Sequence, residues 1–215
     1  MQQRFDLIIF DWDGTLMNSI DWICECLQKA GLDYHCPIPE AQATKNVIGL
    51  STSRAIARLY PNADSKLQNL LVDRYRAHFL SRQLNANDLF PGVKDMLITL
   101  KTNGYQLAIA TGKTRSGLQD ALKTTQTEDL FCVTRCADET ISKPDPKMLL
   151  DIINQTQVSK ERCLMVGDSV FDLQMAQNAQ IPAIAVTCGA QPQELLKPFK
   201  PLLCLNQPTD LLNFI

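Results

Sequence analysis

The feature that most constrains this chain is a largely apolar run, residues 5–10, that leads directly into two carboxylates. Its Phe, Leu and Ile side chains are typical of a buried strand in a parallel sheet. Asp11 and Asp13 follow, and Gly14 permits a sharp turn. Ligands bind at the carboxyl ends of strands in open α/β sheets, and neighbouring acids are unfavourable unless a cation or a shared proton relieves them. We therefore predict that Asp11 and Asp13 belong to a functional site.

Three later segments also place polar side chains at the ends of predicted elements. Residues 105–110 and 163–167 are apolar and predict two further buried strands. A lysine just before Pro144 precedes a predicted helix, whose first turn tolerates proline. The polar residues at these three places are Thr111 with Gly112, Lys143, and Asp168 with Asp172. A plain strand-to-turn junction would explain the first segment alone equally well, but not the recurrence.

In this order, the four segments resemble the four motifs of the haloacid dehalogenase-like superfamily of phosphotransferases. The resemblance covers the whole chain. It implies an α/β fold with a Rossmann-like parallel sheet core, helices on both faces and an inserted all-α cap domain. The residues that carry it are Asp11-Trp12-Asp13-Gly14-Thr15, the strand-ending Thr111, Lys143 before a helix, and Gly167-Asp168-Ser169 with Asp172.

The resemblance to the phosphoglycolate-phosphatase-like group implies an enzyme that hydrolyses a small phosphate monoester. The substrate classes it suggests are phosphoglycolate, a sugar phosphate or a nucleoside monophosphate. Asp11 matches the nucleophile, which would form an aspartyl-phosphate intermediate. Asp13 matches the general acid and base, which would protonate the leaving alcohol and then activate water.

The resemblance also implies a cofactor and a phosphate-binding set. Hard oxygen ligands suit Mg²⁺, and the implied ligands are Asp11, the backbone carbonyl of Asp13, and Asp168. Asp172 would be a further ligand or an acid lying just behind the ligands. The residues that match the phosphate-binding set are Thr111, Gly112 and Lys143.

About ninety residues separate the first two motifs, far more than one crossover helix needs. Their apolar residues recur at helical spacing, and Ser51 and Ser65 are predicted helix N-caps. We therefore expect residues 17–89 to form a helical cap. Residues 1–16 and 90–215 would form the catalytic core.

Two hinges and one loop of this cap are expected to matter for function. Asn18 and residues 85–90 stand where the cap would join the core. In related proteins a glycine-containing cap loop reaches the substrate, and Gly49 with Leu50 is its match here. Arg54, one turn into the next helix, would meet a second anionic group.

Composition limits the partners and the compartment. The 215 residues carry a net charge of −2 without a block of basic residues, which disfavours a nucleic-acid polymer as partner. No apolar run approaches the ~20 residues that cross a bilayer, and we expect no signal peptide before the first strand. Eight scattered cysteines without a C-x-x-C pair favour a reducing, cytoplasmic location. Composition does not predict the oligomeric state.

Two positions depart from the family pattern. Gln180 stands where a helix-ending glycine is usual, and Ala185 where the next strand often has glycine. A non-glycine residue in a left-handed helix end costs on the order of 1 kcal/mol. These departures affect local geometry and leave the expected chemistry unchanged.

Several other functions share part of this pattern. The segment 112–114 looks like the end of a P-loop, but Leu107 stands where its first glycine would be needed. Dehalogenation is disfavoured, because it leaves no alkoxide for Asp13 to protonate. A phosphosugar mutase of the same superfamily shares all four motifs. A non-enzymatic switch resembling phospho-receiver domains is the remaining alternative, although the acceptor on the first strand and the large insertion argue against it.

Overall fold

A parallel six-stranded sheet forms the centre of the protein in the computed structural model, which describes residues 4–215. The strand order is β3-β2-β1-β4-β5-β6, and every neighbouring pair is parallel. The strands are β1 (Leu7–Phe10), β2 (Gln106–Ala110), β3 (Val133–Arg135), β4 (Cys163–Gly167), β5 (Ala183–Val186) and β6 (Cys204–Leu205). The three strands predicted to end in site residues are therefore adjacent at the middle of the sheet, with β1 between β2 and β4.

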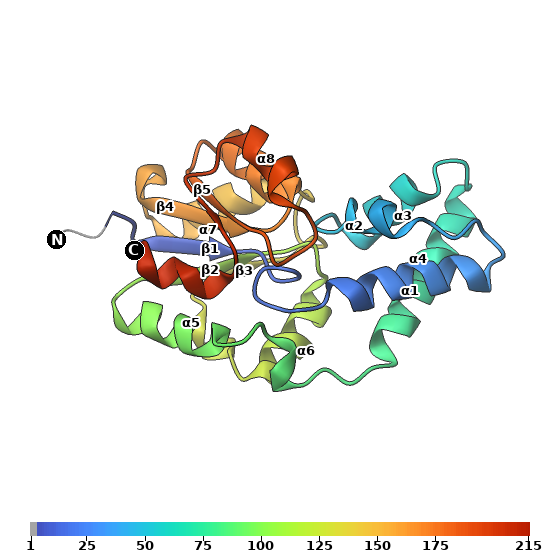
Figure 1. Cartoon of the computed structure of the whole chain (residues 1–215), viewed down its shortest axis with the longest axis horizontal. Coiled ribbons are helices and arrows are strands. Elements are labelled where there is room, and N and C mark those ends of the chain that lie inside the picture. Colours follow the sequence, from blue (N-terminus) through green and yellow to red (C-terminus); the bar gives the residue numbers. More distant parts are fainter. Residues whose placement is uncertain (1–3) are drawn as a thin grey trace.

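Helices cover both faces of this sheet, as the Rossmann-like prediction requires (Figure 1). Successive strand residues point to opposite faces. Ile8 and Phe10 pack with α5 and α6, whereas Leu7 and Ile9 pack with α7 and α8. The helices are α1 (Ile20–Asp33), α2 (Ala41–Lys45), α3 (Thr52–Leu59), α4 (Ser65–Leu80), α5 (Val93–Thr102), α6 (Arg115–Thr125), α7 (Lys147–Thr156), α8 (Val170–Ala179) and α9 (Gln193–Leu196).

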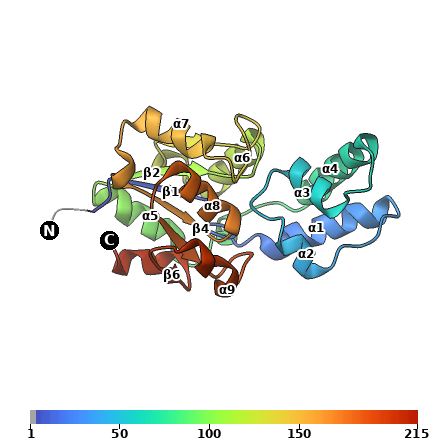
Figure 2. The ribbon, with the colours of Figure 1, turned by 90° about the horizontal axis from the view of Figure 1, so that it is seen from above.

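Helices α1 to α4 form a separate helical body beyond the edge at which the strands end (Figures 1 and 2). They enclose a hydrophobic cluster distinct from those of the sheet, to which Ala190 of the core also belongs. The two connections to the sheet run antiparallel and bond to each other: Asn18 donates to Asp88 O over 2.8 Å, and Phe90 donates to Leu16 O over 2.9 Å. The expected hinge segments thus lie side by side. The boundaries 17–89 of a cap domain stay a prediction.

The predicted N-caps need one correction. Ser65 is the first residue of α4, and the cap is Asp64, whose carboxylate accepts a hydrogen bond from Leu67 N over 2.8 Å. An aspartate one residue earlier thus performs the role assigned to Ser65, which was wrong. Ser51 does occupy the N-cap position of α3, but its side chain makes no capping bond.

Three helices that lead into strands end in glutamine with left-handed backbone. Gln126, Gln157 and Gln180 end α6, α7 and α8 with φ of 55°, 58° and 61°. Glycine adopts this conformation without the steric cost that a Cβ atom adds. Gln180, which stands where the family usually has glycine, therefore adopts a strained backbone conformation at the end of α8. Ala185, the other departure, is buried in β5 without a positive φ.

We predict that Gln180→Gly stabilises the protein by about 0.5–1 kcal/mol, because it removes this strain. Gln119→Gly is the matched control, since Gln119 is exposed within α6 and glycine there should cost about 1 kcal/mol. Urea unfolding of both variants measures the difference. Destabilisation by Gln180→Gly would show that the Gln180 side chain contributes more than its backbone costs.

Candidate active site

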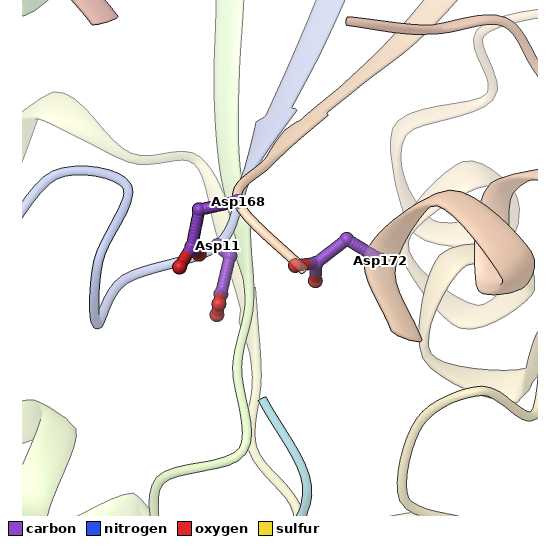
Figure 3. Close-up of side chains that lie close together, drawn as sticks. All are labelled: Asp11, Asp168 and Asp172. Carbon is purple, nitrogen blue, oxygen red and sulfur yellow. The ribbon is translucent and has the colours of Figure 1, made fainter. Parts of the chain in front are cut away.

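Three buried aspartates converge where the central strands end (Figure 3). Asp11 follows β1, Asp168 follows β4, and Asp172 lies in the first turn of α8. Phe10 pairs with Val166 in the parallel register, so the chain leaves β1 and β4 at the same level. Carboxylate oxygens of the three residues lie within 4.8 Å of one another. The sheet topology thus brings three predicted site residues together.

Lys143 lies inside this group of carboxylates. Its side chain is 0% exposed, and its Nζ lies 2.7 Å from Asp11 Oδ1 and 2.6 Å from Asp172 Oδ1. Burial alone would lower the pKa of Lys143, but the two carboxylates outweigh burial and raise it. Lys143 is therefore a cation at neutral pH, and it reduces the repulsion among the acids.

The surrounding chain fixes Asp168 and Asp172 with hydrogen bonds. Thr15 Oγ1 donates to Asp168 Oδ1 over 3.0 Å, and Ala190 N donates to Oδ2 over 2.7 Å. Asp172 accepts from Ser169 Oγ and from Ser169 N through Oδ2, which completes a capping box at the start of α8. With Lys143 on its other oxygen, Asp172 is fully engaged with protein donors.

The electrostatics of the three aspartates favour a bound cation. Burial raises the pKa of Asp11 well above its usual value, although Lys143 opposes this. Burial and the neighbouring Asp172 raise the pKa of Asp168 to about 7. One ammonium faces three carboxyl groups, so all three can be ionised together only if a further positive charge is bound. Carboxylate oxygens that lack a matching positive charge suit a hard divalent cation such as Mg²⁺. The residues present therefore fit the expected cofactor.

Asp13 is held by two contacts that the sequence analysis did not identify. Ser19 Oγ donates to Asp13 Oδ1 over 2.7 Å, and Lys113 Nζ lies 3.2 Å from Asp13 Oδ2. The Lys113 ammonium also lies 4.5 Å from the ring centroid of Phe79 on α4. Its place directly after Gly112 at a strand end was the available signal. Lys113 and Thr114 entered the sequence analysis only as the end of a P-loop, whereas Thr114 in fact caps α6.

A cavity of about 450 Å³ opens in front of Asp11, between the sheet on one side and helices α1, α3 and α4 with residues 47–50 on the other. Lys143, Asp168 and Asp172 lie behind Asp11 and do not line it. The predicted site residues that line it are Asp11, Asp13, Thr111 and Gly112 from the core, and Gly49 and Leu50 from the helical body. Residues from all of these segments therefore face one space.

The loop at Gly49 and Leu50 packs closely on the sheet edge. A Cβ atom on Gly112 would lie 2.6 Å from the Leu50 carbonyl oxygen. Gly49 has φ +100°, and a Cβ atom there would lie 2.7 Å from Ser169 Oγ. Both positions need glycine, because a larger side chain would push the loop away from the site.

Arg54 is placed differently from the other cap residues. Its guanidinium donates to the carbonyl oxygens of Ser142 and Lys143 over 3.1 and 3.2 Å, and it does not line the cavity. Ser51 N donates to Ser142 Oγ over 3.0 Å beside it. The expected contact of Arg54 with a second anionic group stays a prediction. In the structure, Arg54 attaches the helical body to the segment that carries Lys143.

Comparison with known proteins identifies the family. The model of the family described as haloacid dehalogenase-like hydrolase matches residues 8–186, so the chain belongs to that family. The chain is 32% identical to a protein named "Probable phosphatase IndB" from Dickeya dadantii, over 93% of this chain and 89% of that one. It is 29% identical to a phosphoglycolate phosphatase from Mannheimia succiniciproducens, over 88% of each chain.

A solved structure with the same fold is a hydrolase from Pseudomonas syringae. It superposes with a TM-score of 0.88 at 22% identity, covering 99% of this chain and 97% of that one. This similarity supports the fold alone. Together with the family match, it confirms the fold class and the family that the four motifs indicated.

The raised pKa of Asp168 predicts a pH-dependent effect of Mg²⁺. The folded protein keeps this proton up to about pH 7, whereas an unfolded aspartate loses it near its ordinary value of about 3.9. Between these values the folded state binds more protons, so its contribution to the free energy of unfolding falls as the pH rises. A cation bound at Asp168 would replace this proton. The melting temperature should therefore rise more on Mg²⁺ addition at about pH 8 than at about pH 5.5.

Asp168→Asn is the control for this measurement, because it removes both the carboxylate charge and the titration. Thermal unfolding with and without Mg²⁺ at each pH gives the comparison. If Mg²⁺ raised the melting temperature of the wild-type protein equally at both pH values, this would contradict the expectation that Mg²⁺ binds at Asp168.

Proposed function

We propose that this hydrolase is a Mg²⁺-dependent phosphatase that cleaves a small phosphate monoester through an aspartyl-phosphate on Asp11. The observation that carries the proposal is the buried cluster of three aspartates and Lys143, with Asp11 facing a cavity beside Asp13. Family membership and the similarity to two proteins named as phosphatases support the reaction class.

In the first half of the reaction, a carboxylate oxygen of Asp11 attacks the phosphorus atom. The bond from phosphorus to the ester oxygen breaks, and Asp13 donates its proton to the departing alkoxide. Ser19 and Lys113 hold the Asp13 carboxyl at the cavity wall. The released product is the alcohol, and the phosphoryl group remains on Asp11.

In the second half, water attacks the phosphorus atom of the aspartyl-phosphate. Asp13 accepts the proton of that water, the bond to Asp11 breaks, and inorganic phosphate leaves. Each group returns to its starting protonation state. Thr111, Gly112 and Lys143 are proposed to bind the charged equatorial oxygens of the phosphoryl group.

Asp11 and Asp168, with the backbone carbonyl of Asp13, are proposed to hold Mg²⁺. Asp172 makes hydrogen bonds through both oxygens, which favours its role as the acid that positions Lys143. When bound, Mg²⁺ would keep Asp11 ionised and neutralise charge on the phosphate. Each proposed ligand lies at the end of β1 or β4.

We propose that residues 17–89 act as a cap over the cavity and residues 1–16 and 90–215 as the core. The hinge of this cap would be the two antiparallel segments that connect it to the core. They are joined by the hydrogen bonds from Asn18 to Asp88 and from Phe90 to Leu16. The cap would exclude water from the cavity while Asp11 is phosphorylated. The close contact of Leu50 with Gly112 supports this arrangement.

A cytoplasmic location stays part of the proposal. Among the described residues, no helix combines the length and apolarity needed to cross a membrane. All eight cysteines are free, which agrees with a reducing compartment. We also propose that neither a nucleic-acid polymer nor a membrane is a partner of this protein.

The central test compares Asp11→Asn with Asp95→Asn, an exposed aspartate of α5 away from the site. Phosphate release from small phosphate esters should require Mg²⁺ and fall by ~10⁴-fold or more in Asp11→Asn. Asp95→Asn should stay within about twofold of the wild type. Undiminished turnover in a folded Asp11→Asn would contradict the mechanism.

A requirement for a bisphosphate primer would indicate the mutase instead. Turnover without one, like membership of a hydrolase family, also argues against the receiver-like switch.

Gly112→Ala tests the cap contact. The added methyl group would meet the Leu50 carbonyl oxygen and displace the loop, so kcat/KM should fall by roughly ten- to a hundredfold. The increase in melting temperature caused by Mg²⁺ should persist, because the carboxylate cluster lies behind the cavity. Full activity in Gly112→Ala would show that the loop contact is dispensable.

A further inference from the structure

The cavity in front of Asp11 has two chemically different walls. The core wall carries the polar residues at the strand ends. The wall from the helical body is mostly apolar and partly aromatic, with Thr52 and Arg76 as polar members, and its main side chains are Ile23, Leu27, Ile48, Tyr75, Phe79 and Leu80. The rings of Tyr75 and Phe79 lie 6.0 Å apart between centroids, tilted by 33°. A leaving group that extends from the phosphate toward the cap therefore meets hydrocarbon.

The charges around the cavity disfavour a second anionic group on the substrate. Four of the lining residues are carboxylates: Asp11, Asp13, Asp120 and Asp138. In the described part of the chain, the lining cations are Lys113 and Arg76. Lys113 is paired with Asp13, and Arg76 is an exposed residue near Asp73 at 3.7 Å. Carboxylates thus outnumber cations around the cavity, and a further carboxylate would enter a region of net negative charge.

The other arginines of the helical body have partners elsewhere. None of them lines the cavity. Their partners are Asp33 for Arg74, Asp88 for Arg82, the Phe171 ring for Arg58, and the carbonyls of Ser142 and Lys143 for Arg54. Recruiting one of them to bind an anion would break an existing contact.

We propose that the substrate is a phosphate monoester whose alcohol is uncharged and carries an apolar or aromatic ring. This inference rests on the proposed function and narrows its substrate class. The phosphate would lie at Asp11, and the ring would pack against Tyr75, Phe79 and Leu80. Burial of an aromatic ring against these side chains provides the binding energy. A small anionic ester such as phosphoglycolate lacks such a ring and adds a carboxylate.

Three esters of primary alcohols test this inference in the full-length protein with Mg²⁺. Phenethyl phosphate carries the ring, phosphoglycolate carries the carboxylate, and ethyl phosphate carries neither. All three release a primary alkoxide, so differences in kcat/KM report mainly on contacts with the leaving group. Phenethyl phosphate should exceed phosphoglycolate by roughly tenfold or more, with ethyl phosphate between them.

Leu80→Lys sharpens the test. Leu80 lines the cavity and is 69% exposed, so lysine is tolerated there without loss of folding. The new cation should lower the ratio of phenethyl phosphate to phosphoglycolate by about fivefold. Leu32→Lys is the matched control, since Leu32 is 57% exposed on α1 and lies outside the cavity lining. It should leave the ratio unchanged.

The outcomes separate the two levels of the proposal. Equal or better turnover of phosphoglycolate overturns the inference but leaves the phosphatase intact. An unchanged ratio in Leu80→Lys also overturns the inference, because the leaving group then does not pass this wall. Absence of Mg²⁺-dependent phosphate release from all three esters overturns the proposed function and the inference together.

Discussion

The buried ammonium of Lys143 determines how the site is built. It has no exposure to solvent and lies within 2.7 Å of carboxylate oxygens from both Asp11 and Asp172. A buried ammonium without a counter-charge would be strongly unfavourable, and so would buried carboxylates without a cation. The ends of β1 and β4 and the first turn of α8 must therefore assemble around this lysine. Because three acids face one ammonium, they can all be ionised only when a further positive charge is present, and this makes a divalent cation the natural complement.

A second constraint links the helical body to these strand ends. The loop at Gly49 and Leu50 approaches Gly112 so closely that a Cβ atom would collide with backbone. Lys113 spans the same boundary, with Asp13 on one side and the Phe79 ring on the other. Asp13, proposed to transfer protons, and Phe79, which lines the substrate cavity, thus both contact Lys113. Movement of the helical body would change both together.

The sequence predicted those parts of the site that depend on local pattern. Apolar runs ending in Asp11, Thr111 and Asp168 mark strand ends, and parallel strands bring such ends to one edge. Contacts between the helical body and the core were not predicted, because they depend on how the helical body packs against the core. Arg54 bonds to carbonyls 88 and 89 residues away, which no periodicity encodes. The N-cap of α4 at Asp64 instead of Ser65 was missed for a simpler reason: both residue types are good N-caps, and geometry decides between neighbours.

Covalent phosphorylation of Asp11 is the claim on which the account depends, and rapid acid quenching during turnover tests it most directly. The protein is mixed with Mg²⁺ and a phosphate ester, quenched within a single turnover, digested and analysed by mass spectrometry. The account predicts one phosphoryl group on the peptide that contains Asp11, and loss of that group on treatment with hydroxylamine. Turnover with an unmodified Asp11 peptide at every quench time, or a phosphoryl group on another residue, would contradict it.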